Sequence, residues 1–153
     1  MKSKRKRWLA GCALVASSAL LIKLVVFKSI PMIRIGHLRL RFAGPRTGAG
    51  NFVPFKTLAA QIMEPGNHMI SAVNLIGNTV PFMSIGLLVP LVFPSTSWLR
   101  ALGLGVLTGR TFEVMEIAFR VGIFDVDDIM LNSLGVLAGY GAFIVFARSA
   151  RSS

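Results

Sequence analysis

The chain has 153 residues, of which 54% are hydrophobic and only 15% are charged, so one domain is expected. A soluble domain usually carries about 25% charged residues, and this composition therefore excludes an ordinary water-soluble fold. The net charge of +11 comes from 17 Lys and Arg against 6 Asp and Glu. Because the basic residues alternate with long apolar blocks, we expect membrane lipids, anionic or polyprenyl-linked, as partners and no nucleic acid.

Four apolar runs are each long enough to cross a hydrocarbon core of about 30 Å. In chain order they cover residues 8–27, 68–93, 98–119 and 129–147. Each run is predicted to be a helix, because backbone exposed to lipid must satisfy its own hydrogen bonds. The sequence therefore predicts an all-α polytopic membrane protein, a bundle of four transmembrane helices, between a basic segment 1–7 and a short tail 148–153.

The orientation follows from the charges beside the first run. Five basic residues lie within the first seven positions, which places the N-terminus inside under the positive-inside rule. Four spans then return the C-terminus, with Arg148 and Arg151, to the cytoplasmic side. We therefore expect a multi-pass protein with both termini cytoplasmic.

Two processing events are alternatives for the first run. Small residues at 16–19 allow a cleaved signal peptide, but the apolar stretch continues past them through Lys23 to Phe27, which favours a retained helix. The segment Leu9-Ala10-Gly11-Cys12 looks like a lipoprotein cleavage box. No apolar segment precedes it, so lipidation of Cys12 is not expected.

Residues 28–67 form the predicted outer loop, which is long for a connector and therefore expected to be functional or disordered. Several glycines and prolines in it break regular structure. Its segment 51–55 is apolar enough to lie in the membrane interface. The loop also carries six basic residues, namely Lys28, Arg34, Arg39, Arg41, Arg46 and Lys56.

The third run places charged side chains at helical spacing. Gly105, Gly109, Glu113, Glu116 and Arg120 follow one another at steps of four, four, three and four, which is one face of a helix. The glycines let a neighbouring helix approach closely, so the acids are expected to point into the bundle. Glu116 with Arg120, and Arg110 with Glu113, have the spacing of helical ion pairs, and a purely structural ion pair is the alternative to a functional site.

The second and fourth runs supply further polar residues at the same predicted height. Asn74 and Asn78 lie one turn apart, and the fourth run opens with Asp125, Asp127 and Asp128, followed by Asn132. At a rise of about 1.5 Å per residue, four spans bring all of these residues into the outer half of the bundle. The alternatives are interhelical hydrogen bonding for the asparagines and a solvated helix N-terminus for the aspartates.

The predicted polar site comprises Asn74, Asn78, Arg110, Glu113, Glu116, Arg120, Asp125, Asp128 and Asn132. We expect it to be an outward-facing pocket, with the basic loop over its mouth, that binds an anionic lipid headgroup or a cell-wall precursor. The rival hypothesis is internal, with loop cations neutralising the acids. No cofactor is predicted, and no metal site, since the two histidines, His37 and His68, lack metal-ligand spacing.

Four segments resemble those of VanZ-like membrane proteins. Residues 51–57 (NFVPFKT) resemble their N-x-x-P-F segment, which makes Asn51, Pro54 and Phe55 an outer-loop motif. Residues 74–90 resemble their NxxGNxxxFxPxGxxxP helix, Glu113 resembles the Glu of their ExxQ segment, and residues 125–139 resemble their DxxDxxxNxxGxxxG end. The departures are Ser84 for Pro, Glu116 for Gln, and Gly122 where an Arg is usual, with Arg120 two residues earlier.

The resemblance implies a bacterial inner-membrane protein of the cell envelope. The founding member is linked to low-level teicoplanin resistance, by a mechanism not established as enzymatic. A non-enzymatic role, altering access of lipoglycopeptides or binding anionic lipid-linked precursors, is therefore the first functional expectation. A small membrane enzyme using Glu113 and Glu116, or a proton- or ion-coupled transport element using the same acids, are the alternatives.

Overall fold

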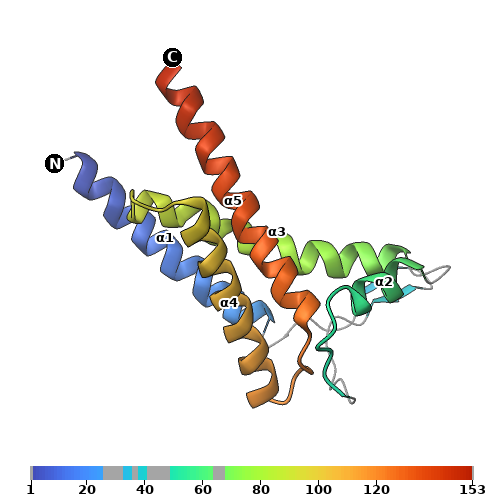
Figure 1. The fold of residues 1–153 in the computed structure, drawn as a ribbon. Helices are drawn as coiled ribbons and strands as arrows, with labels where there is room; N and C mark the ends of the chain where they lie inside the picture. Colours follow the sequence, from blue (N-terminus) through green and yellow to red (C-terminus); the bar gives the residue numbers. More distant parts are fainter. Residues whose placement is uncertain (1, 26–32, 36–37, 41–48, 64–67, 153) are drawn as a thin grey trace.

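The computed structural model describes residues 2–25, 33–35, 38–40, 49–63 and 68–152 of the chain. The described part contains five helices and one two-stranded hairpin (Figure 1). In chain order these elements are α1 (Lys2–Val25), β1 (Ile33–Ile35), β2 (Leu38–Leu40), α2 (Lys56–Met63), α3 (His68–Val92), α4 (Trp98–Ala118) and α5 (Val126–Ser152).

Three of the described helices are long and apolar enough to cross a membrane, with spans at Lys4–Leu24, Ala72–Val92 and Val126–Ala150. These three coincide with the predicted runs 8–27, 68–93 and 129–147, and they identify the chain as a membrane protein. α4 coincides with the third predicted run, 98–119, but it carries too many charged residues to count as a membrane span by composition. Every 18-residue window of α4 includes at least three of Arg100, Arg110, Glu113 and Glu116.

The predicted outer loop contains more structure than expected. β1 and β2 pair antiparallel, with Arg34 opposite Arg39, and α2 follows from Lys56. The predicted loop 28–67 therefore contains regular structure at these elements. Among the predicted basic residues of the loop, Lys28, Arg41 and Arg46 lie outside the described residues, as does His37.

α5 lies at the centre of the fold and packs against both α3 and α4. Close packing with α3 depends on glycines on both helices. A Cβ at Gly86 of α3 would lie 1.9 Å from the carbonyl oxygen of Val136, and a Cβ at Gly139 of α5 would lie 2.0 Å from that of Met83. The two backbones are therefore in contact, as small residues permit between transmembrane helices.

The apolar core fills the space on either side of this contact. Phe82 and Val136 are completely buried, and the rings of Phe82 and Phe112 meet edge to face at a centroid distance of 5.1 Å, which is a favoured aromatic geometry. α1 packs on α3, and its Leu21 joins this core.

Different elements lie at the two ends of the bundle. In Figure 1 the start of α1, the α3–α4 turn and the end of α5 lie toward one side. The end of α1, α2, the start of α3 and the α4–α5 turn lie toward the other. The second end holds the residues described next.

Candidate functional site

The inward face of α4 has the composition that helical spacing predicts. Gly105, Gly109, Glu113 and Glu116 are all buried, and both carboxyl side chains are less than 7% exposed. A Cβ at Gly105 would lie 2.8 Å from the Cα of Ser133 on α5. The glycines therefore bring the α4 backbone against α5, and the two acids follow them into the interior.

The two arginines assigned to the same site do not lie in the interior with the acids. Arg110 and Arg120 are exposed, whereas Glu113 and Glu116 are buried. Arg120 does not continue the face of α4, because the helix ends at Ala118 and Arg120 adopts a left-handed backbone conformation with φ of 56°. The spacing argument that extended the face to Arg120 is therefore wrong, since it assumed helical geometry for two residues beyond Ala118.

The turn after α4 is a Schellman motif. The N–H of Val121 donates to the carbonyl of Glu116 at 2.9 Å, and the N–H of Arg120 donates to that of Ile117 at 3.0 Å. These are the two bonds that satisfy the last carbonyls of a helix in this motif. The left-handed position is usually glycine, and here Arg120 occupies it.

Gly122 follows this turn and lies directly against Glu116. A Cβ at Gly122 would lie 2.0 Å from Oε2 of Glu116. The two residues that depart from the family pattern, Glu116 in place of Gln and Gly122 in place of Arg, are therefore neighbours in the fold. A side chain at position 122 has no room while the carboxyl group of Glu116 lies there.

Asp125 connects α4, α5 and the segment before α2. Its backbone N–H donates to Oε2 of Glu113 at 2.7 Å. Its own Oδ1 accepts the N–H of Asp127 at 3.0 Å, which caps the N-terminus of α5. The same Oδ1 accepts Nδ2 of Asn51 at 2.9 Å. Two backbone hydrogen bonds also link Asn51 to the chain at Phe124 and Val126.

Asp127 is the most buried acid of the region, with 1% of its surface exposed. Oδ1 accepts the N–H of Phe55 at 2.6 Å, and Oδ2 accepts those of Thr57 and Leu58 at 2.8 and 3.1 Å. Thr57 and Leu58 belong to the first turn of α2, whose N–H groups have no partner within the helix, and Phe55 lies directly before it. Asp127 therefore caps α2 from another helix, a role that the sequence did not assign to it.

The asparagines of α3 complete the arrangement. Nδ2 of Asn78 donates to Oδ1 of Asp128 on α5. Asn78 also contacts Asn74 at 3.5 Å, and Nδ2 of Asn74 donates to Gln61 of α2 at 3.1 Å. The predicted convergence of α3 and α5 polar residues is thus present as direct hydrogen bonds.

We call the following residues the polar cluster: Asn51, Asn74, Asn78, Glu113, Asp125, Asp127 and Asp128. Asn132 lies beside it, and its Oδ1 is a buried oxygen atom without a hydrogen-bond partner. Pro54 and Phe55 form the turn before α2, where Phe55 has a positive φ of 65°.

The acids of the polar cluster bind backbone N–H groups. Glu113, Asp125 and Asp127 each accept at least one backbone N–H, and hydrogen bonds of this kind stabilise a carboxylate. Among the described residues, no three His, Cys, Asp or Glu side chains are arranged so that they could hold a metal ion. The acids therefore hold three helices and a turn together through oriented N–H groups.

A family model for VanZ/LLP1 matches residues 14–147. The chain belongs to this family. The VanZ/LLP1 match begins within α1, ends within α5 and includes every residue of the polar cluster, so the resemblance found in the sequence is confirmed. Comparison with curated proteins and with solved structures gives no match.

Proposed function

We propose that this VanZ-like protein is a non-enzymatic protein of the bacterial cell envelope that binds an anionic, lipid-linked ligand at the outer face of the inner membrane. In this proposal α4 is a fourth span. Its acids Glu113 and Glu116 are buried against α5, so they do not face lipid. Arg110 lies in the outer half of the helix, about 12 Å from its end at a rise of about 1.5 Å per residue, and its long side chain extends toward the interface.

The observation that carries the proposal is the turn held by Asp127. The three N–H groups bonded to its carboxylate fix residues 55–58. This leaves Phe52, Val53 and Phe55 each more than half exposed, with Lys56 exposed next to them. Such a cluster of apolar side chains at the surface indicates contact with a membrane or a ligand.

We call residues 52–56 the platform. Its apolar side chains suit the chain of an amphiphile, and Lys56 suits a phosphate or carboxylate group. Phe52 also stacks on Phe124, with ring centroids 4.8 Å apart, so the platform is attached to the turn before α5 as well as to α5 itself. A surface held at both points is preorganised, which lowers the entropic cost of binding.

Binding is tested with the full-length protein in nanodiscs and with polyprenyl phosphate as the probe, against uncharged polyprenol. We expect tighter binding of the phosphate, weakened by Lys56→Gln, and weakened binding of both probes in Phe55→Asn. Asn tolerates the positive φ at this position, so the turn is retained. Arg148→Gln removes a cation from the opposite end and is expected to leave binding unchanged. Equal binding of the two probes by the wild-type protein would refute the proposal.

Glu113→Gln separates this function from its alternatives. Oε2 of Glu113 accepts the N–H of Asp125, which gives this side chain a structural role. Loss of lipid turnover in the variant would instead support an enzyme. Loss of proton flux in liposomes would instead support transport.

The orientation in this proposal is tested by reporter fusions. Four spans put both termini in the cytoplasm and the α4–α5 turn, residues 119–125, outside. A fusion at position 123 should therefore report the periplasmic or external side, and a fusion after Ser153 the cytoplasmic side. A cytoplasmic reporter at position 123 together with an external one after Ser153 would exclude α4 as a span, because α1, α3 and α5 would then be the spans.

A further inference from the structure

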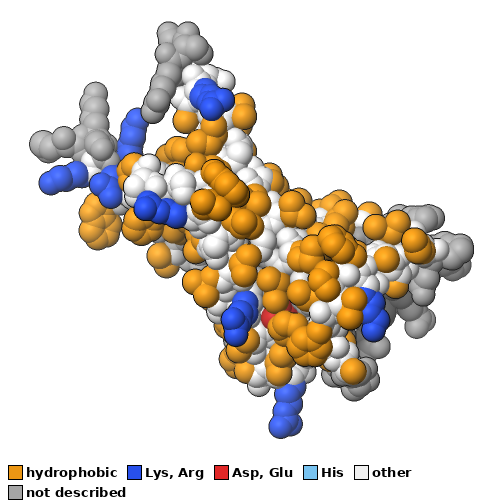
Figure 2. Space-filling view, in the orientation of Figure 1, with side chains coloured by type: hydrophobic (Ala, Val, Ile, Leu, Met, Phe, Trp, Pro, Cys, Tyr) orange, Lys and Arg blue, Asp and Glu red, His pale blue; other side chains and the backbone are white. Residues whose placement is uncertain are grey.

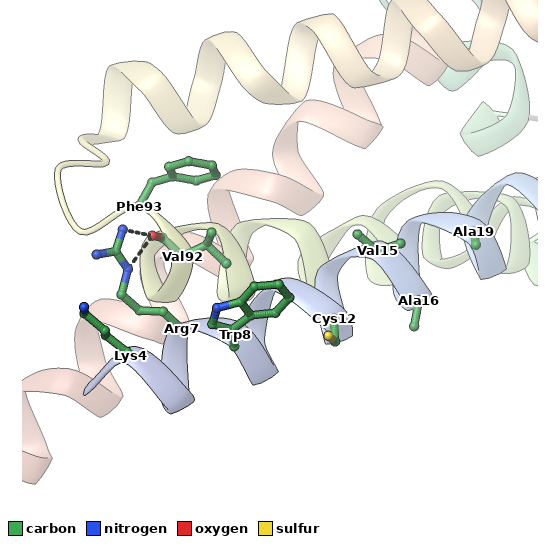
Figure 3. Close-up of a pocket in the computed structure, with 10 residues that line it drawn as sticks. Lys4, Arg7, Trp8, Cys12, Val15, Ala16, Ala19, Val92 and Phe93 are labelled. Carbon is green, nitrogen blue, oxygen red and sulfur yellow. Dashed lines mark hydrogen bonds between the residues drawn. The ribbon is translucent and has the colours of Figure 1, made fainter. Parts of the chain in front are cut away.

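A groove of about 750 Å³ runs along α1 next to the end of α3 (Figure 3). It begins at the start of α1, which lies at the opposite end of the bundle from α2 and the α4–α5 turn (Figure 1). Small residues, among them Gly11, Ala16 and Ala19, line its length. Lys4, Arg7 and Trp8 lie at one end of it. The groove is therefore apolar along its length and basic at one end.

The basic end of the groove has no acidic neighbour in the described part of the chain. All five described Asp and Glu residues lie at positions 113–128, at the other end of the molecule. Lys4 is followed by Arg5, Lys6 and Arg7 on the same helix end. An anion would therefore find several cations there and no competing carboxylate.

Arg7 is fixed in place by the protein itself. Its Nε and Nη2 donate to the carbonyl oxygen of Val92 at 3.2 and 3.0 Å, which satisfies a carbonyl at the end of α3 that has no helical partner. These bonds use one edge of the guanidinium group and attach α1 to α3. Nη1 is in no hydrogen bond to the described residues, and an arginine can donate from it to a phosphate oxygen.

We propose that this groove binds an anionic phospholipid of the surrounding leaflet, with one acyl chain along the small residues and the phosphate at Lys4 and Arg7. The exposed indole of Trp8 lies between the two parts, as amphipathic aromatic side chains do at membrane interfaces. The positive charges of Lys4 and Arg7 favour a negatively charged headgroup. The absence of a side chain at Gly11 leaves space for the acyl chain of the lipid. This site is separate from the platform and does not depend on the function proposed for it.

Tryptophan quenching measures this binding directly. The chain has two Trp residues, so Trp98→Phe leaves Trp8 as the only indole in the full-length protein. In vesicles doped with lipids brominated on the acyl chains, phosphatidylglycerol should quench Trp8 at lower mole fraction than phosphatidylcholine. One basic side chain near an anionic surface supplies about a fivefold preference. Lys4→Gln is therefore expected to reduce the preference about fivefold.

Two further variants make the experiment specific. Gly11→Leu fills the groove, and it should fold because a Cβ at Gly11 meets no atom within 4 Å; quenching by both lipids should fall. Lys23→Gln removes an exposed cation at the other end of α1 and should leave the preference unchanged. Equal quenching by the two lipids, a preference retained in Lys4→Gln, or an equal loss in Lys23→Gln would each overturn the proposal.

Discussion

Replacing Asp127 with Asn keeps the shape of the side chain but exchanges one of its two acceptor oxygens for an N–H₂ donor. The native carboxylate accepts three backbone N–H groups, those of Phe55, Thr57 and Leu58. The amide oxygen of Asn serves best in the position of Oδ2, where it keeps two of these bonds. The amide nitrogen then faces the N–H of Phe55, donor against donor.

The cost of this change follows from the three bonds. A hydrogen bond to a charged group contributes about 1.5–3 kcal/mol and a neutral one about 0.5–1.5 kcal/mol, so each of the two retained bonds weakens by about 1 kcal/mol. The lost bond leaves a donor without a partner, at a cost of about 1–3 kcal/mol. Since these bonds are only partly buried, we take the lower values and expect a total of about 3 kcal/mol.

Hydrogen–deuterium exchange of residues 51–63, with the protein in nanodiscs, measures this effect. A cost of about 3 kcal/mol corresponds to exchange faster by about two orders of magnitude. Asp128→Asn is the matched control, because the carboxylate that accepts the N–H groups at the start of α2 is that of Asp127, and exchange of residues 51–63 should be unaffected. Unchanged protection in Asp127→Asn would refute the view that this carboxylate holds the platform.

Two further predictions concern backbone geometry. Gly86→Ala places a Cβ 1.9 Å from the carbonyl oxygen of Val136 and should lower the free energy of unfolding by at least about 1–3 kcal/mol. Gly77→Ala is the control, because a Cβ there meets nothing within 4 Å, and it should not lower this free energy. Unfolding in mixed detergent micelles measures both variants. Arg120→Gly removes the strain of a positive φ of 56° and should raise the free energy of unfolding by about 1 kcal/mol in the same assay. A lower free energy of unfolding would indicate that the Arg120 side chain makes a stabilising contact.

The sequence predicts the helices well because a helix that crosses a bilayer needs a long, uninterrupted apolar run. Uninterrupted apolar length identified α1, α3 and α5, and their bounds differ from the predicted runs by only a few residues at most positions. α4 is less clear for a physical reason, since its acids face α5 and its composition therefore resembles that of a soluble helix. Only the spacing of Gly105 and Gly109 indicated which side of α4 is buried.

The site was predicted as a set of residues but not as a set of bonds. Asn78 and Asp128 were placed at a common height by counting residues along two helices, and they do meet. Asp127 was not assigned to the site, because its partners lie about 70 positions earlier, in a turn without a repeating pattern. The available signal was local: α2 begins after Pro54 and Phe55, neither of which is able to cap it.

The distribution of charge gives the cluster and the groove opposite characters. At the polar cluster, Asp125 and Asp127 accept backbone N–H groups, so these two carboxylates are stabilised by backbone dipoles. The large excess of Lys and Arg in the chain is therefore not consumed in neutralising them. Exposed cations such as Lys4 and Lys56 remain available at both ends of the bundle, where anionic groups attached to lipids are the partners that a membrane supplies.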